Sequence, residues 1–231
     1  MESIAGVKKI IECFKDKIKP GNCLFVHGGG PEISCWLNKF DMDVSFVNGQ
    51  RVTDSRAVKV VEMVLSGRVN KLLVSAFNSL GYSACGLSGR DGNTAVASII
   101  DKKLGYVGKV EKIDPGLLKA LMEKDFIPVV SPVCSSADFG ALNVNADFFA
   151  SAVAAAFGAR ELDFITSTGG VLKGGEVIGE ISLSDIEGLI ESGIVSRGML
   201  PKLLSARKAI EGGVERVNMI DFKGTTGTVI K

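Results

Sequence analysis

The sequence predicts an α/β fold, a three-layer sandwich around a mainly parallel sheet. Short runs rich in Val and Ile alternate along the chain with amphipathic stretches of roughly 10 to 15 residues, which is the pattern of strands joined by helices. Of the 231 residues, 46% are hydrophobic and 23% are charged, a composition far from that of a disordered chain. This length allows one large α/β domain or two halves that share a core.

The N-terminal half is expected to begin with a helix over residues 4–18, because apolar residues recur there at helical spacing and Pro20 follows. Residues 22–26 are typical of a short buried strand. Pro31 suits the first turn of the next helix, and Asp54 is a suitable N-cap for a later one. The other elements expected in this half are helices over 57–65, 69–80 and 115–124, antiparallel hairpins within 84–113 and a buried strand over 126–131.

The C-terminal half continues the alternation of strands and helices. Residues 145–157 are expected to form an alanine-rich helix, whose small side chains allow close packing on a sheet. The other elements expected are strands over 162–166, 214–220 and 228–230 and helices over 182–192 and 201–211. A stretch rich in Ser, Ala, Asp and Gly at 131–141 predicts the boundary between the halves, which we assign to residues 1–136 and 137–231.

Charge and cysteine content restrict the partners of the protein. Lys and Arg total 27 against 26 for Asp and Glu, and the net charge of +1 favours neither a nucleic acid nor a membrane surface. No apolar run is long enough to span a membrane, and Met1-Glu2 is not typical of a signal peptide. The five cysteines are scattered and never spaced as C-x-x-C, which indicates reduced thiols and no zinc site. We therefore expect a cytoplasmic protein that binds a small molecule.

A glycine-rich turn, His27-Gly28-Gly29-Gly30, lies between a predicted strand and a predicted helix. Glycines let the backbone approach a ligand closely, and N–H groups at a helix N-terminus suit a carboxylate or a phosphate. The alternative is a tight strand-to-helix turn with no ligand. An esterase is excluded because G-x-S-x-G with a later histidine is absent, and neither nucleotide-binding glycine fingerprint is present.

Polar residues in two further segments could hold an acidic substrate. Arg51 precedes the predicted N-cap and could form a bidentate pair with a substrate carboxylate, or it could pair with a local acid such as Asp54. Asn143, Asn145 and Asp147 share one face if that segment is extended. Burying all three is costly without a ligand or mutual hydrogen bonds, and helix capping explains one of them.

Lys202 follows Pro201 in the first turn of a predicted helix, where the helix dipole disfavours a cation. An ammonium group that stabilises a transferring phosphoryl group would explain this position. The alternative is a solvated surface lysine.

Six segments, in this order, resemble the amino acid kinase family: residues 26–33, 48–54, 86–92, 107–110, 142–147 and 198–202. The resemblance implies transfer of the γ-phosphoryl group of ATP to the side-chain carboxylate of N-acetyl-L-glutamate, which gives an acyl phosphate. It further implies that the N-terminal half binds the amino acid and forms a homodimer, and that the C-terminal half binds ATP. Mg²⁺ would be carried mainly on the ATP phosphates.

The resemblance also assigns roles to residues. Lys202 would stabilise charge on the leaving side, and Asp147 would position the lysines. The residues implied to bind the substrate are Gly29, Gly30, Arg51, Asn143 and Asn145. The residues implied to contact the nucleotide are Ser167, Thr168, Gly169, Gly170, Val171, Leu172, Ile194, Val195, Ser196 and Met199.

The sequence departs from the family pattern at its start. Family members open with a strand that ends in Lys-x-Gly-Gly, and here the usual first strand is lacking, while Lys8 and Lys9 lie within the first predicted helix. Ser167 and Gly169 also replace an aspartate and a proline of the family's nucleotide turn. We therefore expect slower turnover than in a chain that has this strand. The alternative functions are a kinase for aminoadipate or glutamate attached to a carrier protein, and a catalytically impaired binding or regulatory homologue.

Overall fold

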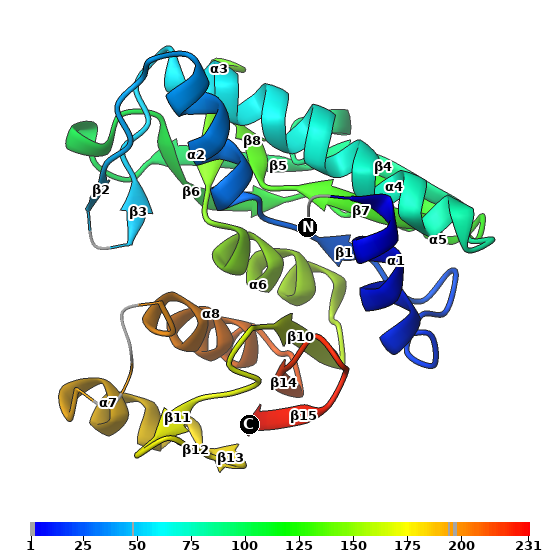
Figure 1. Cartoon of the computed structure of the whole chain (residues 1–231), viewed down its shortest axis with the longest axis vertical. Helices are drawn as coiled ribbons and strands as arrows, with labels where there is room; N and C mark the ends of the chain where they lie inside the picture. Colours follow the sequence, from blue (N-terminus) through cyan, green and yellow to red (C-terminus); the bar gives the residue numbers. More distant parts are fainter. Residues whose placement is uncertain (1–2, 48, 194, 196–197) are drawn as a thin grey trace. The chain divides into compact units, whose positions relative to one another are not determined.

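The computed structural model describes residues 3–47, 49–193, 195 and 198–231 of the chain (Figure 1). The chain divides into two compact units, residues 1–149 and residues 150–231. Strands and helices alternate along both units, which confirms the predicted α/β class. The strands belong to separate sheets and a barrel, whereas the sequence led us to expect one mainly parallel sheet.

The parallel sheet of unit 1 has three strands in the order β1 (Phe25–Val26), β7 (Ile127–Ser131) and β4 (Ala84–Ser88). All of β7 is buried, as expected for a strand with a neighbour on each side. β1 pairs only with β7 among the described residues and is half-buried. The predicted strand over 22–26 is therefore shorter and less buried than expected, because an edge strand is covered on one side only.

The helices of unit 1 start where the sequence predicted but differ in length. They are α1 (Ile4–Cys13), α2 (Gly30–Lys39), α3 (Ala57–Glu62), α4 (Asn70–Ser79) and α5 (Gly116–Met122). α1 ends at Cys13, before the predicted residue 18. Phe14 and Ile18 are buried as their apolar character suggests, but they lie in the turn that follows the helix. Asp54 Oδ1 accepts hydrogen bonds from the N–H groups of Arg56 and Ala57, which confirms its predicted place at a helix start.

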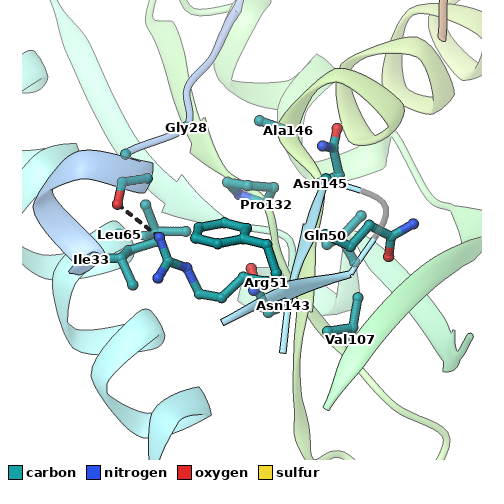
Figure 2. A pocket seen from close by; sticks show the side chains of 15 residues that line it. Gly28, Ile33, Gln50, Arg51, Leu65, Val107, Pro132, Asn143, Asn145 and Ala146 are labelled. Atoms are coloured by element: carbon teal, nitrogen blue, oxygen red, sulfur yellow. Dashed lines mark hydrogen bonds between the residues drawn. The ribbon is translucent and has the colours of Figure 1, made fainter. Parts of the chain in front are cut away.

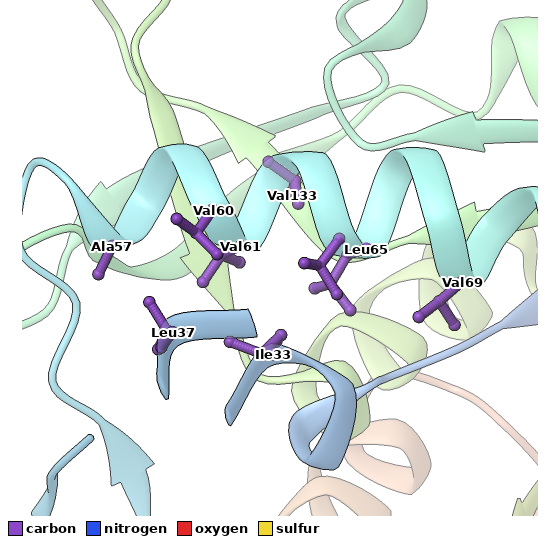
Figure 3. Close-up of a cluster of buried hydrophobic side chains, with 9 residues drawn as sticks. Ile33, Leu37, Ala57, Val60, Val61, Leu65, Val69 and Val133 are labelled. Atoms are coloured by element: carbon purple, nitrogen blue, oxygen red, sulfur yellow. The ribbon is translucent and has the colours of Figure 1, made fainter. Parts of the chain in front are cut away.

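The segment Met63–Val69 is π-helical and joins α3 to α4, so residues 57–79 form one continuous helical stretch where the sequence predicted two helices. Figure 1 shows this stretch in cyan as a single element of unit 1. α2 packs against it through a hydrophobic cluster that includes Ile33, Leu37, Val61 and Leu65 (Figure 3). The cluster fixes the start of α2 beside the π-helical segment.

A closed barrel completes unit 1, with β5 (Ala95–Ile99), β6 (Val107–Ile113), β9 (Ala141–Val144) and β8 (Val133–Ser135) in that order. β5 and β6 form the antiparallel hairpin expected from the sequence, whereas β4 joins the parallel sheet instead. A smaller hairpin joins β2 (Phe46–Val47) to β3 (Gln50–Arg51). Because β8 and β9 pair with β5 and β6, the compact division follows residue 149 and not residue 136.

Unit 2 holds a four-stranded sheet in the order β10 (Glu161–Ile165), β14 (Arg216–Ile220), β15 (Thr226–Ile230) and β13 (Glu180–Ile181). β10 and β14 are parallel, but β14 and β15 are antiparallel, so this sheet is mixed. A hairpin pairs β11 (Leu172–Lys173) with β12 (Glu176–Val177). The helices are α7 (Leu183–Glu191) and α8 (Leu200–Glu211), and the division between units falls within α6 (Ala146–Phe157).

Two features bear on the expected environment of the protein. None of the helices in the described residues is long and apolar enough to cross a membrane. All five cysteines are free thiols, and burial raises the pKa of Cys134 to about 12.

Candidate active site

A pocket of about 200 Å³ lies in unit 1, where the start of α2, the β2–β3 hairpin and the start of α6 meet (Figure 2). It brings together all five residues that the sequence assigned to the substrate: Gly29, Gly30, Arg51, Asn143 and Asn145. The rest of its lining is mostly apolar and includes Ile33, Leu65 and Val107. A small organic molecule with a few polar groups fits a pocket of this kind.

The glycine turn lines one wall of the pocket. A Cβ atom on Gly29 would lie 2.7 Å from Leu65 Cδ2, so any other residue there would require the Leu65 side chain to move. A Cβ on Gly30 would meet nothing within 4 Å, so packing does not require glycine there. Among the described residues, the N–H groups of Gly28, Gly29 and Gly30 donate to no protein acceptor. These N–H groups at the start of α2 are suited to an anion.

Arg51 on β3 supplies a cation to the same pocket. Its side chain is buried, with 7% exposed, and Nη2 donates to the carbonyl oxygen of Gly30 at 2.9 Å and to Ser34 Oγ at 2.8 Å. Nη1 is buried without a hydrogen-bond partner in the described part of the chain. Burial lowers the pKa of Arg51, but a guanidinium group stays charged near pH 7. Asp54, the alternative partner, is occupied at the start of α3, so Arg51 is left with a donor for an anionic ligand.

The two asparagines of the pocket are held differently. Asn143 Nδ2 donates to Thr53 Oγ1 at 3.2 Å, and that hydroxyl donates to the carbonyl oxygen of Arg51 at 2.9 Å. Asn145 Oδ1 accepts a hydrogen bond from the N–H of Asp147 at 2.9 Å and so caps α6. Asp147 lies half-buried in the first turn of α6. Capping therefore explains Asn145, whereas Asn143 ties β9 to the strand that carries Arg51.

Lys202 lies in unit 2, in the first turn of α8 as predicted. Its side chain is half-buried, and Nζ lies 5.6 Å from the centroid of the Phe164 ring on β10. A cation over an aromatic ring at this distance is held in place by the ring quadrupole. This ring contact is compatible with both interpretations of Lys202, so its part in phosphoryl transfer stays a prediction.

The glycine turn of unit 2 follows β10 and is closely packed. Gly169 has a φ of +70°, which favours glycine, and a Cβ on Gly170 would lie 2.7 Å from Thr228 Oγ1. Thr168 Oγ1 donates to the carbonyl oxygen of Gly170 at 3.0 Å, which closes the turn. Ser167 and Thr168 are exposed. Packing and backbone conformation thus explain both glycines without a ligand.

The other residues assigned to the nucleotide differ in exposure. Val171 and Met199 are buried in unit 2, and their side chains belong to its core. Leu172 is exposed, and Val195 is half-buried. Three residues of the motifs lie outside the described residues, and these are Asn48, Ile194 and Ser196.

Residues 2–221 match the amino acid kinase family. The chain belongs to this family. Among its relatives, an acetylglutamate kinase of Bacillus pumilus is 45% identical over 209 residues, which cover 89% of this chain and 81% of the relative. An acetylglutamate kinase of Prochlorococcus marinus subsp. pastoris is 46% identical over 201 residues, which cover 85% of this chain and 71% of the relative.

Solved structures share the fold of this amino acid kinase. A protein of Streptococcus mutans UA159 superposes with a TM-score of 0.87 at 31% identity, covering 97% of this chain and 91% of that one. N-acetylglutamate synthase from Neisseria gonorrhoeae, complexed with coenzyme A and N-acetyl-glutamate, gives a TM-score of 0.81 at 20% identity, covering 98% of this chain and 55% of the synthase. The second likeness concerns the fold alone.

Sequence reasoning assigned no role to several residues that line this kinase's pocket or hold its lining residues. Thr53, with 0% exposed, links Asn143 to β3, and Ser34 holds Arg51 from the second turn of α2. Gln50 lines the pocket with a buried Oε1 that lacks a partner among the described residues. The Phe46 ring lies 4.7 Å from the Arg51 guanidinium. Ser34 could have been found from its place one helical turn after Gly30, and Gln50 and Thr53 lie within the segment 48–54, whereas nothing local marks Phe46.

The described residues contain no group of three or more His, Cys, Asp or Glu side chains that could hold a metal ion.

Proposed function

We propose that this amino acid kinase is an acetylglutamate kinase, which phosphorylates the side-chain carboxylate of N-acetyl-L-glutamate in arginine biosynthesis. The observation that carries the proposal is the presence of two anion-binding elements in one pocket. The buried guanidinium of Arg51 and the glycine turn with its unpaired N–H groups, judged among the described residues, both line the pocket. A molecule with two carboxylates satisfies both. The two relatives named above carry the same name and are 45% and 46% identical to this chain.

In this proposal the α-carboxylate pairs with Arg51, beside Asn143 and Asn145. The side-chain carboxylate lies against the N–H groups of Gly29 and Gly30. The apolar lining of the pocket accommodates the methyl group of the acetyl moiety. Burying the guanidinium is costly without an opposite charge, and the substrate supplies that charge.

The reaction needs no general base, because the acceptor carboxylate is already ionised near pH 7. One of its oxygens attacks the γ-phosphorus of ATP while the bond from that phosphorus to the β–γ bridging oxygen breaks. ADP leaves with the electron pair, and the product is an acyl phosphate. Catalysis of this kind depends on positioning and on stabilising the charge that spreads over the phosphoryl oxygens.

The remaining assignments follow from the resemblance to the family. Unit 2 binds ATP through the 167–172 turn and the residues near Val195 and Met199. Lys202 stabilises the charge on the leaving side, and Asp147 keeps the positioning role that the resemblance implies. Mg²⁺ enters on the ATP phosphates, its usual ligands in phosphoryl transfer. Unit 1 forms a homodimer, and the enzyme is cytoplasmic.

The test traps the acyl phosphate with hydroxylamine, which converts it into a hydroxamate that forms a coloured iron complex. The protein is incubated with ATP, Mg²⁺ and N-acetyl-L-glutamate, with free L-glutamate and L-2-aminoadipate as comparison substrates and a reaction without ATP as control. We expect hydroxamate that depends on ATP and on the N-acetyl group. A further reaction contains glutamate or aminoadipate linked to a carrier protein, and product from this substrate alone would support the carrier-dependent kinase instead. A chain that makes no product from any of these acids would be a binding or regulatory homologue.

A further inference from the structure

A buried polar network lies at the base of the unit 1 glycine turn, outside the proposed substrate contacts. His27 follows β1 and is 7% exposed, and Asn70 at the start of α4 is fully buried. His27 Nδ1 lies 2.9 Å from the carbonyl oxygen of Gly28, and its Nε2 lies 3.1 Å from Asn70 Nδ2. The N–H of His27 donates to the carbonyl oxygen of Val130 at 3.1 Å. The ring thus connects the glycine turn to the buried side chain of Asn70 on α4.

The network determines which ring nitrogen carries the proton. Lys71 Nζ donates to Asn70 Oδ1 at 3.0 Å, and Asn70 Nδ2 donates to the carbonyl oxygen of Val129 at 2.8 Å. The amide is therefore oriented with its NH₂ group toward His27, whose Nε2 must accept. The proton consequently lies on Nδ1 and is donated to the carbonyl oxygen of Gly28. Burial lowers the pKa of His27, which keeps the ring in this neutral form.

The hydrogen bond to the carbonyl oxygen of Gly28 also sets the direction of the Gly29 N–H, because both groups belong to one planar peptide. The peptide bonds of the described residues include no cis bond, so the carbonyl of Gly28 and the N–H of Gly29 point in opposite directions. Because the carbonyl faces the buried ring, the N–H of Gly29 faces away from it, and Gly28, Gly29 and Gly30 line the pocket. A peptide between two glycines rotates easily when nothing holds it.

We propose that His27 is a positioning residue for phosphoryl transfer, whose Nδ1–H holds the peptide between Gly28 and Gly29 so that the Gly29 N–H is directed at the reacting carboxylate. This inference rests on the proposed function, since it assumes that the turn binds the acceptor carboxylate. His27 touches no reacting atom itself. Its effect is preorganisation, because a donor that is already aligned needs no rearrangement as charge develops.

Two substitutions at His27 distinguish the hydrogen bond that Nδ1 donates from the one that Nε2 accepts. His27→Asn places an amide N–H near the position of Nδ1 and removes the acceptor for Asn70. His27→Gln places an amide oxygen near the position of Nε2 and removes the donor to Gly28. We expect His27→Gln to lower kcat for N-acetyl-L-glutamate by about ten- to a hundredfold, with a smaller change in KM. His27→Asn should retain kcat to within about threefold.

Thermal midpoints measured on both variants provide the structural control, because each variant loses one hydrogen bond at the same buried position. A ring that only fastens the fold would lower both midpoints and leave kcat equal in the two variants at a temperature well below them. Equal kcat values with an active wild type would overturn the role of His27 and leave the proposed function intact. A wild-type chain that makes no hydroxamate from N-acetyl-L-glutamate would overturn both.

Discussion

The glycine turn of unit 1, residues 28–30, and that of unit 2, residues 169–170, differ in what surrounds the position of the missing side chain. At Gly30 a Cβ would enter open space, and the N–H groups of the unit 1 turn have no acceptor among the described residues. At Gly170 a Cβ would meet Thr228 Oγ1 and Val177 Cγ1, each at 2.7 Å. The same residue type therefore leaves open space at Gly30 and allows close packing at Gly170, as it also does at Gly29. A glycine-rich motif alone does not distinguish these two uses.

The largest expected effect tests whether unit 2 contributes chemistry as well as packing. Lys202→Met should lower kcat by about a hundredfold or more while changing both KM values much less, because the charge that it stabilises develops in the transition state. Lys208→Met on the same helix is the matched control, since Lys208 is an exposed lysine of α8. Steady-state kinetics on both variants decide the matter, and similar kcat values in the two would remove Lys202 from catalysis.

The second effect concerns the cation that faces the unit 1 turn. Arg51→Ala should raise the KM for N-acetyl-L-glutamate roughly ten- to a hundredfold, because a charge-assisted hydrogen bond contributes about 1.5 to 3 kcal/mol. The KM for ATP should stay nearly unchanged. Parallel titration of the two substrates measures the difference, and an equal rise in both KM values would contradict the assignment of Arg51 to the substrate.

A pair of alanine substitutions tests the comparison of the turns directly. Gly170→Ala should lower the free energy of unfolding by about 1 to 3 kcal/mol, since the new methyl group overlaps Thr228 and Val177. Gly30→Ala should leave the thermal midpoint unchanged or slightly raised, because the space is open and alanine restricts the unfolded chain. Its kcat/KM should nevertheless fall about tenfold as the methyl group enters the pocket. A destabilised Gly30→Ala variant would show that both turns are packing devices.

The smallest effect is a pH dependence at the base of the unit 1 turn. Burial lowers the pKa of His27, its hydrogen bond to Gly28 opposes this, and the charge of Lys71 lowers the pKa further. Below about pH 6.5 the unfolded chain therefore binds a proton before the folded chain does, and stability falls as the pH falls. We expect the midpoint of the wild type to approach that of His27→Asn between about pH 7 and pH 5. Parallel midpoint curves over this range would mean that His27 does not contribute to the pH dependence.

The sequence located the parts of the site that are encoded locally. Pro31 and Asp54 mark helix starts, and Arg51 and Asn143 line the pocket as predicted. The pairing of strands that are distant in the sequence could not be predicted in this way. The stretch at 131–141, predicted to be the boundary between the halves, contains β8. This strand pairs with β5, some forty residues earlier in the chain, so the division between units follows residue 149. Thr53 was missed because its partner Asn143 is distant in sequence.

The hydrogen bond from Arg51 Nη2 to the carbonyl oxygen of Gly30 has a consequence for substrate length. It joins the two anion-binding elements at 2.9 Å, so neither can shift without the other. If each element binds one carboxylate, as proposed, the pocket fits only a substrate whose two carboxylates have a matching separation. A substrate with one additional methylene group must bend or leave one element unmatched, and discrimination between such homologues is typically about 1 to 3 kcal/mol. Under the proposed function, selectivity between glutamate and aminoadipate skeletons would then depend on this single contact between Arg51 and the backbone of Gly30.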